Sequence, residues 1–131
     1  MPHRFRVKVR FAELDPYDHV NHAVYFTYCE TARIELLDEI GWGMDKLAEM
    51  DRHIVVSEVS ARFLAAAELG DELVVETIVD VKRITSRWSQ RILRNGEPIV
   101  EAELTGAVTD LAGRPLRIPA GLAEALETYR E

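Results

Sequence analysis

Residues 11–26 read FAELDPYDHVNHAVYF, and this stretch decides how the rest of the chain is arranged. It predicts the end of a strand, a polar loop, and the start of a long helix that continues to Ile40. Asn21 is a favourable N-cap, because its side-chain oxygen can accept a hydrogen bond from a free N–H of the first helical turn. The early helix is apolar on most sides, which is typical of a buried helix. We therefore expect the polar loop to lie at the positive end of a buried helix dipole.

Ionisable side chains gather in this loop and at the helix start, namely Glu13, Asp15, Asp18, His19 and His22. A carboxylate beside free backbone N–H groups suits chemistry at a carbonyl, since the N–H groups can stabilise the developing oxyanion. An ionised aspartate can attack a carbonyl carbon or deprotonate a water molecule, and the residues do not distinguish these routes. From spacing alone, Asp15-Pro16 fits an ordinary turn better than a catalytic site.

From His53 onward the pattern changes from helical to alternating. Four strands are predicted, over Ile54–Leu64, Glu72–Lys82, Ser86–Arg94 and Pro98–Thr109. Asn95-Gly96 between two alternating runs is the strongest short signal for a hairpin. Alternation from Phe5 to Phe11 predicts a first strand, and short helices are expected over Trp42–Met50 and Ala120–Arg130.

This order of elements predicts an α+β fold with one antiparallel sheet and one buried helix, in a single domain over residues 1–131. A helix that is apolar on most sides needs more cover than a flat sheet provides. We therefore expect the sheet to curl around the helix, or a second subunit to help cover it.

Composition limits the classes of function. The chain has 131 residues and a net charge of −7, which argues against nucleic-acid binding and against binding to anionic membranes. No apolar run reaches the roughly 20 residues of a membrane span, and the first residues lack the apolar core of a signal peptide. Cys29 is the single cysteine, so an internal disulfide is excluded and a cytoplasmic location is the simplest expectation.

Residues 9–22, VRFAELDPYDHVNH, followed by Tyr25, Glu30, Ala32 and Arg33, resemble the signature of hotdog-fold thioesterases of the 4-hydroxybenzoyl-CoA thioesterase type. Leu69-Gly70-Asp71 is similar to a turn of the same family. The resemblance covers residues 5–119 and implies a five-stranded antiparallel sheet wrapped around one long central helix. It also implies a homo-oligomer, dimer or tetramer, with active sites at the dimer interface, and hydrolysis of acyl-CoA without a metal or organic cofactor.

Carried over by position, the resemblance gives Asp15 the role of the catalytic aspartate. His22 then falls where a backbone N–H polarises the thioester carbonyl, while Tyr17 and His19 occupy positions that hold polar side chains in related enzymes. Asp18 departs from the pattern, because the family often has glycine in this turn. His19 and His22 also fit structural roles equally well, and their irregular spacing with carboxylates makes us reject a metal site.

Two further groups are candidates for substrate binding. Tyr25 could line an acyl pocket, although an aromatic residue in a buried helix more often belongs to the core. Lys82, Arg83 and Arg87 lie in or beside one predicted turn of an acidic chain, and Lys and Arg suit the phosphates of CoA. The alternative for this basic group is an ordinary solvated surface balanced by nearby carboxylates.

We expect an acyl-CoA thioesterase, and two other functions stay open. One is a non-catalytic acyl-CoA-binding protein with the hotdog fold, because a fold does not fix a function. The other is a hotdog enzyme of the enoyl-CoA hydratase type, which would use an aspartate and a histidine on the acyl chain. The sequence does not reveal the acyl length, or whether CoA or a carrier protein bears the thioester.

Overall fold

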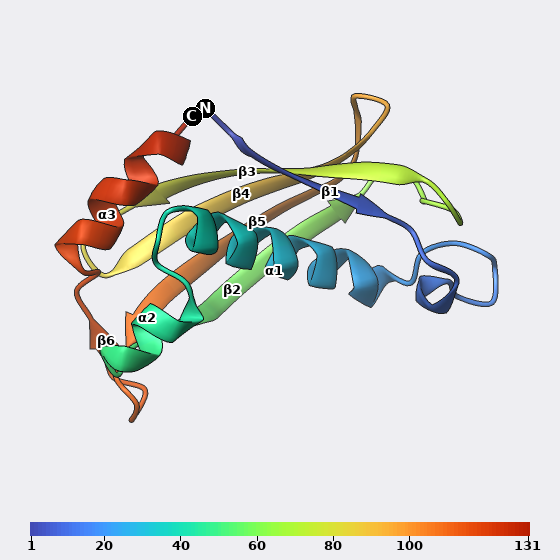
Figure 1. The fold of residues 1–131 in the computed structure, drawn as a ribbon. Coiled ribbons are helices and arrows are strands. Elements are labelled where there is room, and N and C mark those ends of the chain that lie inside the picture. The colour runs from blue at the N-terminus through green and yellow to red at the C-terminus, as the bar shows by residue number, and fades with distance from the viewer.

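The long helix predicted from the sequence is α1 (His22–Glu39). A computed structural model, which describes all 131 residues, places α1 across one face of an antiparallel sheet (Figure 1). Asn21 caps the helix as predicted, since its side-chain oxygen accepts a 2.9 Å hydrogen bond from the Ala23 N–H. After the helix, Gly41 adopts a φ of +80°, a left-handed conformation that glycine tolerates without strain.

Five long strands form the sheet in the order β1-β3-β4-β5-β2, with every neighbouring pair antiparallel. Their bounds are β1 His3–Lys8, β2 His53–Phe63, β3 Glu72–Val81, β4 Thr85–Arg94 and β5 Glu97–Thr109. A two-residue strand, β6 (Pro115–Leu116), pairs with the end of β5 and was not predicted. The predicted α+β class with an antiparallel sheet is confirmed.

The first predicted strand is too long at its C-terminal end. β1 stops at Lys8, and Phe11–Glu13 forms a 3-10 turn instead of extended backbone. The turn is favoured because the Glu13 carboxylate accepts the backbone N–H of Arg10 at 2.8 Å. Phe11, which the alternation placed on the buried face, is 78% exposed.

Shorter helices complete the fold. α2 (Met44–Glu49) follows α1, and α3 (Ala120–Leu126) leads into a 3-10 turn, η2 (Glu127–Tyr129), at the C-terminus. The two chain termini lie side by side (Figure 1), with the N-terminal ammonium group close to Thr128 and Glu131. None of the helices combines the length and apolarity needed to cross a membrane.

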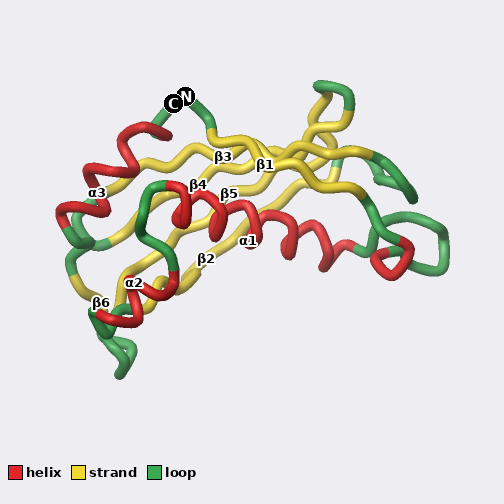
Figure 2. The backbone as a smooth tube through the Cα atoms, in the orientation of Figure 1, coloured by secondary structure: helices red, strands yellow, loops and turns green.

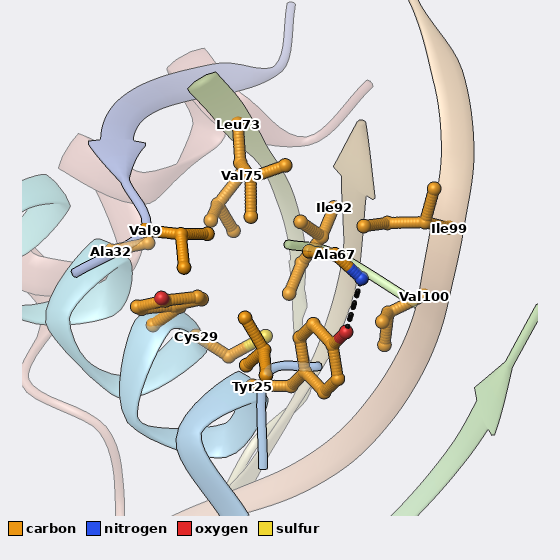
Figure 3. Close-up of a cluster of buried hydrophobic side chains, with 12 residues drawn as sticks. Val9, Tyr25, Cys29, Ala32, Ala67, Leu73, Val75, Ile92, Ile99 and Val100 are labelled. Atoms are coloured by element: carbon orange, nitrogen blue, oxygen red, sulfur yellow. Dashed lines mark hydrogen bonds between the residues drawn. The ribbon is translucent and has the colours of Figure 1, made fainter. Parts of the chain in front are cut away.

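Two groups of buried apolar side chains lie between α1 and the sheet. The first surrounds the N-terminal half of α1 and includes Tyr25 and Val75 (Figure 3). The second surrounds the C-terminal half and includes Leu36, Trp88 and, from α3, Leu122. Thus α3 packs on the same face of the sheet as α1 and closes the core at that end.

One side of α1 is left uncovered in the single chain. Phe26 is 40% exposed, and Thr27 and Glu30 on the same helix are also exposed. Val56 and Val59 on the neighbouring edge strand β2 are exposed as well. A single sheet therefore covers only one side of α1, and the expected burial of this helix is incomplete in one chain.

Candidate active site

The loop that precedes α1 (residues 9–21) lies beside the connection between β2 and β3 (residues 64–71) (Figure 2). The Val20 N–H donates to the Ala67 carbonyl at 2.9 Å, and His19 forms an isolated antiparallel bridge with Glu68. The N–H of Asn21 donates to the carbonyl of Glu13 at 3.0 Å. These bonds close the loop and hold it against the start of α1.

Asp15 closes the turn formed by residues 15–19 with one of its two carboxylate oxygens. Its Oδ1 accepts the backbone N–H groups of Tyr17 at 2.8 Å and His19 at 3.2 Å. Its own backbone N–H donates to the His19 carbonyl at 2.7 Å. Oδ2 has no hydrogen-bond partner in the chain, and the residue is partly exposed. The turn therefore fixes the carboxylate and leaves one oxygen available to a ligand or to water.

Asp18 occupies the position at which the resembling family often has glycine. Its φ is +63°, a left-handed conformation that Asp and Asn adopt more readily than most residues. Its N–H donates to the Asp15 carbonyl at 3.1 Å. The turn thus keeps a glycine-like backbone at this position while carrying an extra carboxylate.

The first turn of α1 contains a free backbone donor. Asn21 accepts the N–H of Ala23 with its side chain and the N–H of Val24 with its carbonyl. The N–H of His22 makes no hydrogen bond within the chain. An unused N–H at the positive end of a helix dipole is a suitable partner for an oxyanion.

An aromatic cluster adjoins this helix end. The imidazole of His22 packs on Phe63, with ring centroids 4.7 Å apart, and Phe63 is also 5.7 Å from Tyr25 and 6.1 Å from Phe26. Phe63 is the last residue of β2 and is 41% exposed. Local sequence predicts Phe63 only as a strand residue, because the packing of β2 beside α1 is what brings it to the helix start.

An open groove of about 250 Å³ runs between α1 and strands β2 and β5. Local sequence does not predict this groove, since it depends on contacts between distant segments. It is mostly apolar but contains two charged side chains on one face of α1. The lining residues are Phe26, Thr27, Cys29, Glu30, Arg33, Val56, Val59, Ala102 and Leu104.

The two candidate tyrosines and Cys29 lie in different surroundings. Tyr17 is 79% exposed, whereas Tyr25 is buried and its hydroxyl accepts the Ala67 N–H at 2.9 Å (Figure 3). Burial raises the pKa of the Cys29 thiol to about 11, so this cysteine stays protonated at neutral pH and is not an activated nucleophile.

The basic group predicted to bind phosphates lies at the opposite end of the sheet from Asp15. Lys82 and Arg83 follow β3, and the Arg83 carbonyl accepts the N–H of Ile118 just before α3. β3 spans ten residues, or roughly 33 Å, from the loop end to this turn. Lys82 is paired with Asp80 at 2.9 Å, and Arg87 is paired with Glu103. One chain therefore does not bring these cations to the candidate active site.

The family model that matches this chain describes the thioesterase-like superfamily and covers residues 9–126. The chain belongs to this superfamily. The resemblance that the loop signature indicated is thereby confirmed over nearly the whole sequence. In this thioesterase-like protein, the matched region includes Asp15 and the first turn of α1, where the His22 N–H is unpaired.

Named relatives extend the likeness. A chloroplastic acyl-acyl carrier protein thioesterase of Arabidopsis thaliana is 36% identical over 128 residues, covering 92% of this chain and 65% of that relative. This chain therefore spans less than two thirds of the length of that plant protein. Acyl-CoA thioesterase YbgC of Haemophilus influenzae is 33% identical over 118 residues, covering 88% of this chain and 87% of that protein.

A solved structure shows the same likeness in three dimensions. The crystal structure of a Thermus thermophilus thioesterase complexed with coenzyme A and Zn is 33% identical, with a TM-score of 0.84. The match covers 97% of this chain and 92% of that one. In the present protein, no three or more His, Cys, Asp or Glu side chains are grouped so that they could hold a metal ion.

Proposed function

We propose that this protein hydrolyses acyl-CoA thioesters to a free acid and CoA. The observation that carries the proposal is the position of Asp15, whose free Oδ2 lies in a loop tied to the open first turn of α1. Membership of the thioesterase-like superfamily supports it, as does the likeness to a named acyl-CoA thioesterase.

Asp15 performs the chemical step by one of two routes. As a general base, it removes a proton from a water molecule whose oxygen attacks the carbonyl carbon. As a nucleophile, its Oδ2 attacks the carbonyl carbon to form a mixed anhydride, which water then cleaves. In both routes the carbon–sulfur bond breaks, the electron pair leaves with sulfur, and the CoA thiolate takes up a proton.

The N–H of His22 stabilises the oxyanion that forms on the carbonyl oxygen, with the dipole of α1 adding to the effect. Tyr17 and His19 flank the same turn, and we assign them to contacts with the bound thioester. Tyr25 supports the acyl end from the core, where its ring adjoins Phe63 and the groove begins at Phe26.

The nucleotide end of CoA requires cations, and we propose that Lys82, Arg83 and Arg87 reach it from a second subunit. The single chain favours such an assembly, because β2 is an edge strand and several of its apolar side chains are exposed. A second copy that covers β2 and the open side of α1 would turn α1 into the long central helix of a hotdog dimer. We place this single-domain protein in the cytoplasm as a dimer or a homotetramer.

The decisive experiment compares Asp15→Asn with Asp18→Asn in thiol release from a panel of acyl-CoAs. Both substitutions remove one charge from the same turn, and asparagine can keep the hydrogen bonds and the left-handed conformation. We expect Asp15→Asn to lose about 10²- to 10⁴-fold in kcat with an unchanged melting temperature. Asp18→Asn should keep kcat within about threefold. Full activity of Asp15→Asn would reject the assignment of Asp15.

The same panel separates the other functions. Tight acyl-CoA binding without thiol release would favour a binding protein, and hydration of crotonyl-CoA with an intact thioester would favour a hydratase. Acyl carrier protein thioesters belong in the panel, because the Arabidopsis relative is named for them. Faster thiol release from the carrier protein than from CoA would identify an acyl carrier protein thioester as the substrate. The proposed hydrolytic mechanism would stay the same.

A further inference from the structure

Glu13 receives more hydrogen bonds than any other acidic side chain near the loop. Its Oε1 accepts the Tyr28 hydroxyl at 2.7 Å and the Arg10 backbone N–H at 2.8 Å. Its Oε2 accepts Arg10 Nη2 at 2.9 Å, and its backbone carbonyl accepts the N–H of Asn21 at 3.0 Å. Glu13, two positions before Asp15, is therefore bonded to Arg10 in the loop, to the N-cap Asn21 and to Tyr28 of α1.

Tyr28 is a rigid anchor for Glu13. Its side chain is 3% exposed and belongs to the core around the N-terminal half of α1. Burial and the adjacent Glu13 carboxylate raise the pKa of the Tyr28 hydroxyl, so it remains a hydrogen-bond donor at neutral pH. Burial alone would raise the pKa of Glu13, but hydrogen bonds from Arg10 and Tyr28 outweigh it and lower that pKa. The pair is thus a neutral donor and an ionised acceptor under working conditions.

A second tyrosine holds the other end of the loop. The hydroxyl of Tyr25, one helical turn before Tyr28, accepts the N–H of Ala67 (Figure 3), and the carbonyl of Ala67 accepts the N–H of Val20. The segment that contains Asp15 is therefore held at both ends by tyrosines of α1. Of these two contacts, only the one from Tyr28 involves a charged side chain, Glu13, and it fixes the segment before Asp15.

We propose that Tyr28 and Glu13 form a positioning pair, which sets the Asp15 carboxylate relative to the open N–H at the start of α1. This inference rests on the proposed thioester hydrolysis. It follows from the need for accurate geometry, because a displacement of about 1 Å in a reacting group can cost about 10²-fold in rate. Neither side chain touches substrate, and each acts through the loop.

The test measures kcat and KM separately in Tyr28→Phe and Glu13→Gln, with thermal unfolding as a measure of folding. We expect Tyr28→Phe to lower kcat about 10- to 100-fold and to change KM less than about threefold. Glu13→Gln keeps an acceptor oxygen for Tyr28, so its loss should be smaller than that of Glu13→Ala. The double variant should be no slower than the slower single variant, because both changes break one contact.

The matched control is Tyr129→Phe, which removes a tyrosine hydroxyl that donates to Glu39 at the other end of α1. Its kcat should stay within about twofold of the wild-type value. Wild-type kcat in Tyr28→Phe, beside a large loss in Asp15→Asn, would overturn the positioning role and leave the proposed function intact. If Tyr28→Phe does not fold, the order of Glu13→Gln and Glu13→Ala decides the question. A wild-type protein that releases no thiol would remove the proposed function, and this inference with it.

Discussion

The two ends of α1 carry the same chemical pair in different surroundings. Near the N-terminal end, Tyr28 donates to Glu13 at 2.7 Å, and both side chains are largely buried. Near the C-terminal end, Tyr129 donates to Glu39 at 3.3 Å, and the Glu39 side chain is 55% exposed. The buried pair holds a loop, whereas the exposed pair lies on the surface. The contribution of a tyrosine–glutamate hydrogen bond therefore depends on burial and on the segment that it anchors.

The cores around these two ends also differ. Hydrogen bonds link the N-terminal half and the middle of α1 to neighbouring segments. The Tyr25 hydroxyl accepts the Ala67 N–H at 2.9 Å, and Gln90 accepts Arg33 at 2.7 Å and donates to the Cys29 carbonyl at 2.9 Å. The C-terminal half is packed with Leu36 and Leu37 and is closed by α3. Satisfied polar networks specify one geometry, whereas apolar burial supplies most of the stability. We infer that the C-terminal end stabilises the fold and that the N-terminal end sets the geometry of the reaction.

The largest expected effect on stability is at the C-terminal end. Leu36 is fully buried, and Leu36→Ala should lower the free energy of unfolding by about 3 kcal/mol, because it leaves a cavity. Urea unfolding measures the loss, and kcat per folded molecule should stay within about twofold. Leu111, which is 62% exposed, provides the control, since Leu111→Ala should cost less than about 0.5 kcal/mol. A folded Leu36→Ala variant with a strongly reduced kcat would contradict the division between the two ends.

Most of this frame could be predicted from local sequence. The alternation of Leu73, Val75 and Thr77 specifies which face of β3 is buried, and all three side chains are buried. Asn95-Gly96 specifies a hairpin because its residues adopt φ values of +52° and +80°. Asn21 marks the start of α1 through a contact only two residues away. In each case the physical cause lies within a few residues of the pattern.

Contacts between distant segments could not be predicted from local sequence. Glu13 ends the first strand early by binding Arg10, but its second partner, Tyr28, is fifteen residues away. Phe63 reaches His22 only because β2 packs beside α1. The distance of Lys82 from the loop depends on the direction of β3 in the sheet. Periodicity predicts which face of an element is buried, and does not predict which other element covers it.

A smaller effect is expected on the pH dependence of stability. The pKa of Glu13 is lowered in the folded protein, where hydrogen bonds from Arg10 and Tyr28 outweigh the opposing effect of burial. Its stabilising contribution is therefore complete above the ordinary glutamate pKa of about 4.3 and is lost as the pH falls through the lower folded value. As the pH falls below about 4.3, wild type should therefore lose more stability than Glu13→Gln, which has no carboxylate to protonate at this position.

Urea unfolding at several pH values in this range measures that difference. Arg10→Gln serves as an intermediate case, because it removes one donor to Glu13 and leaves the Tyr28 bond. Its pH dependence should lie between those of wild type and Glu13→Gln. Parallel curves for all three proteins would show that Glu13 is not held in its ionised form by these contacts.

The smallest expected effect belongs to Tyr129→Phe. The substitution removes one long hydrogen bond to a half-exposed carboxylate, and phenylalanine keeps the ring that packs edge-on against His3 at 5.3 Å. The free energy of unfolding should therefore change by less than about 0.5 kcal/mol in a urea titration. Tyr28→Phe also removes a tyrosine hydroxyl oxygen that donates to a glutamate. A larger loss of stability or of kcat in Tyr28→Phe than in Tyr129→Phe would therefore arise from the burial of the Tyr28–Glu13 pair and from the loop that it holds. Equal losses in the two variants would mean that the pair itself, and not its surroundings, determines the effect.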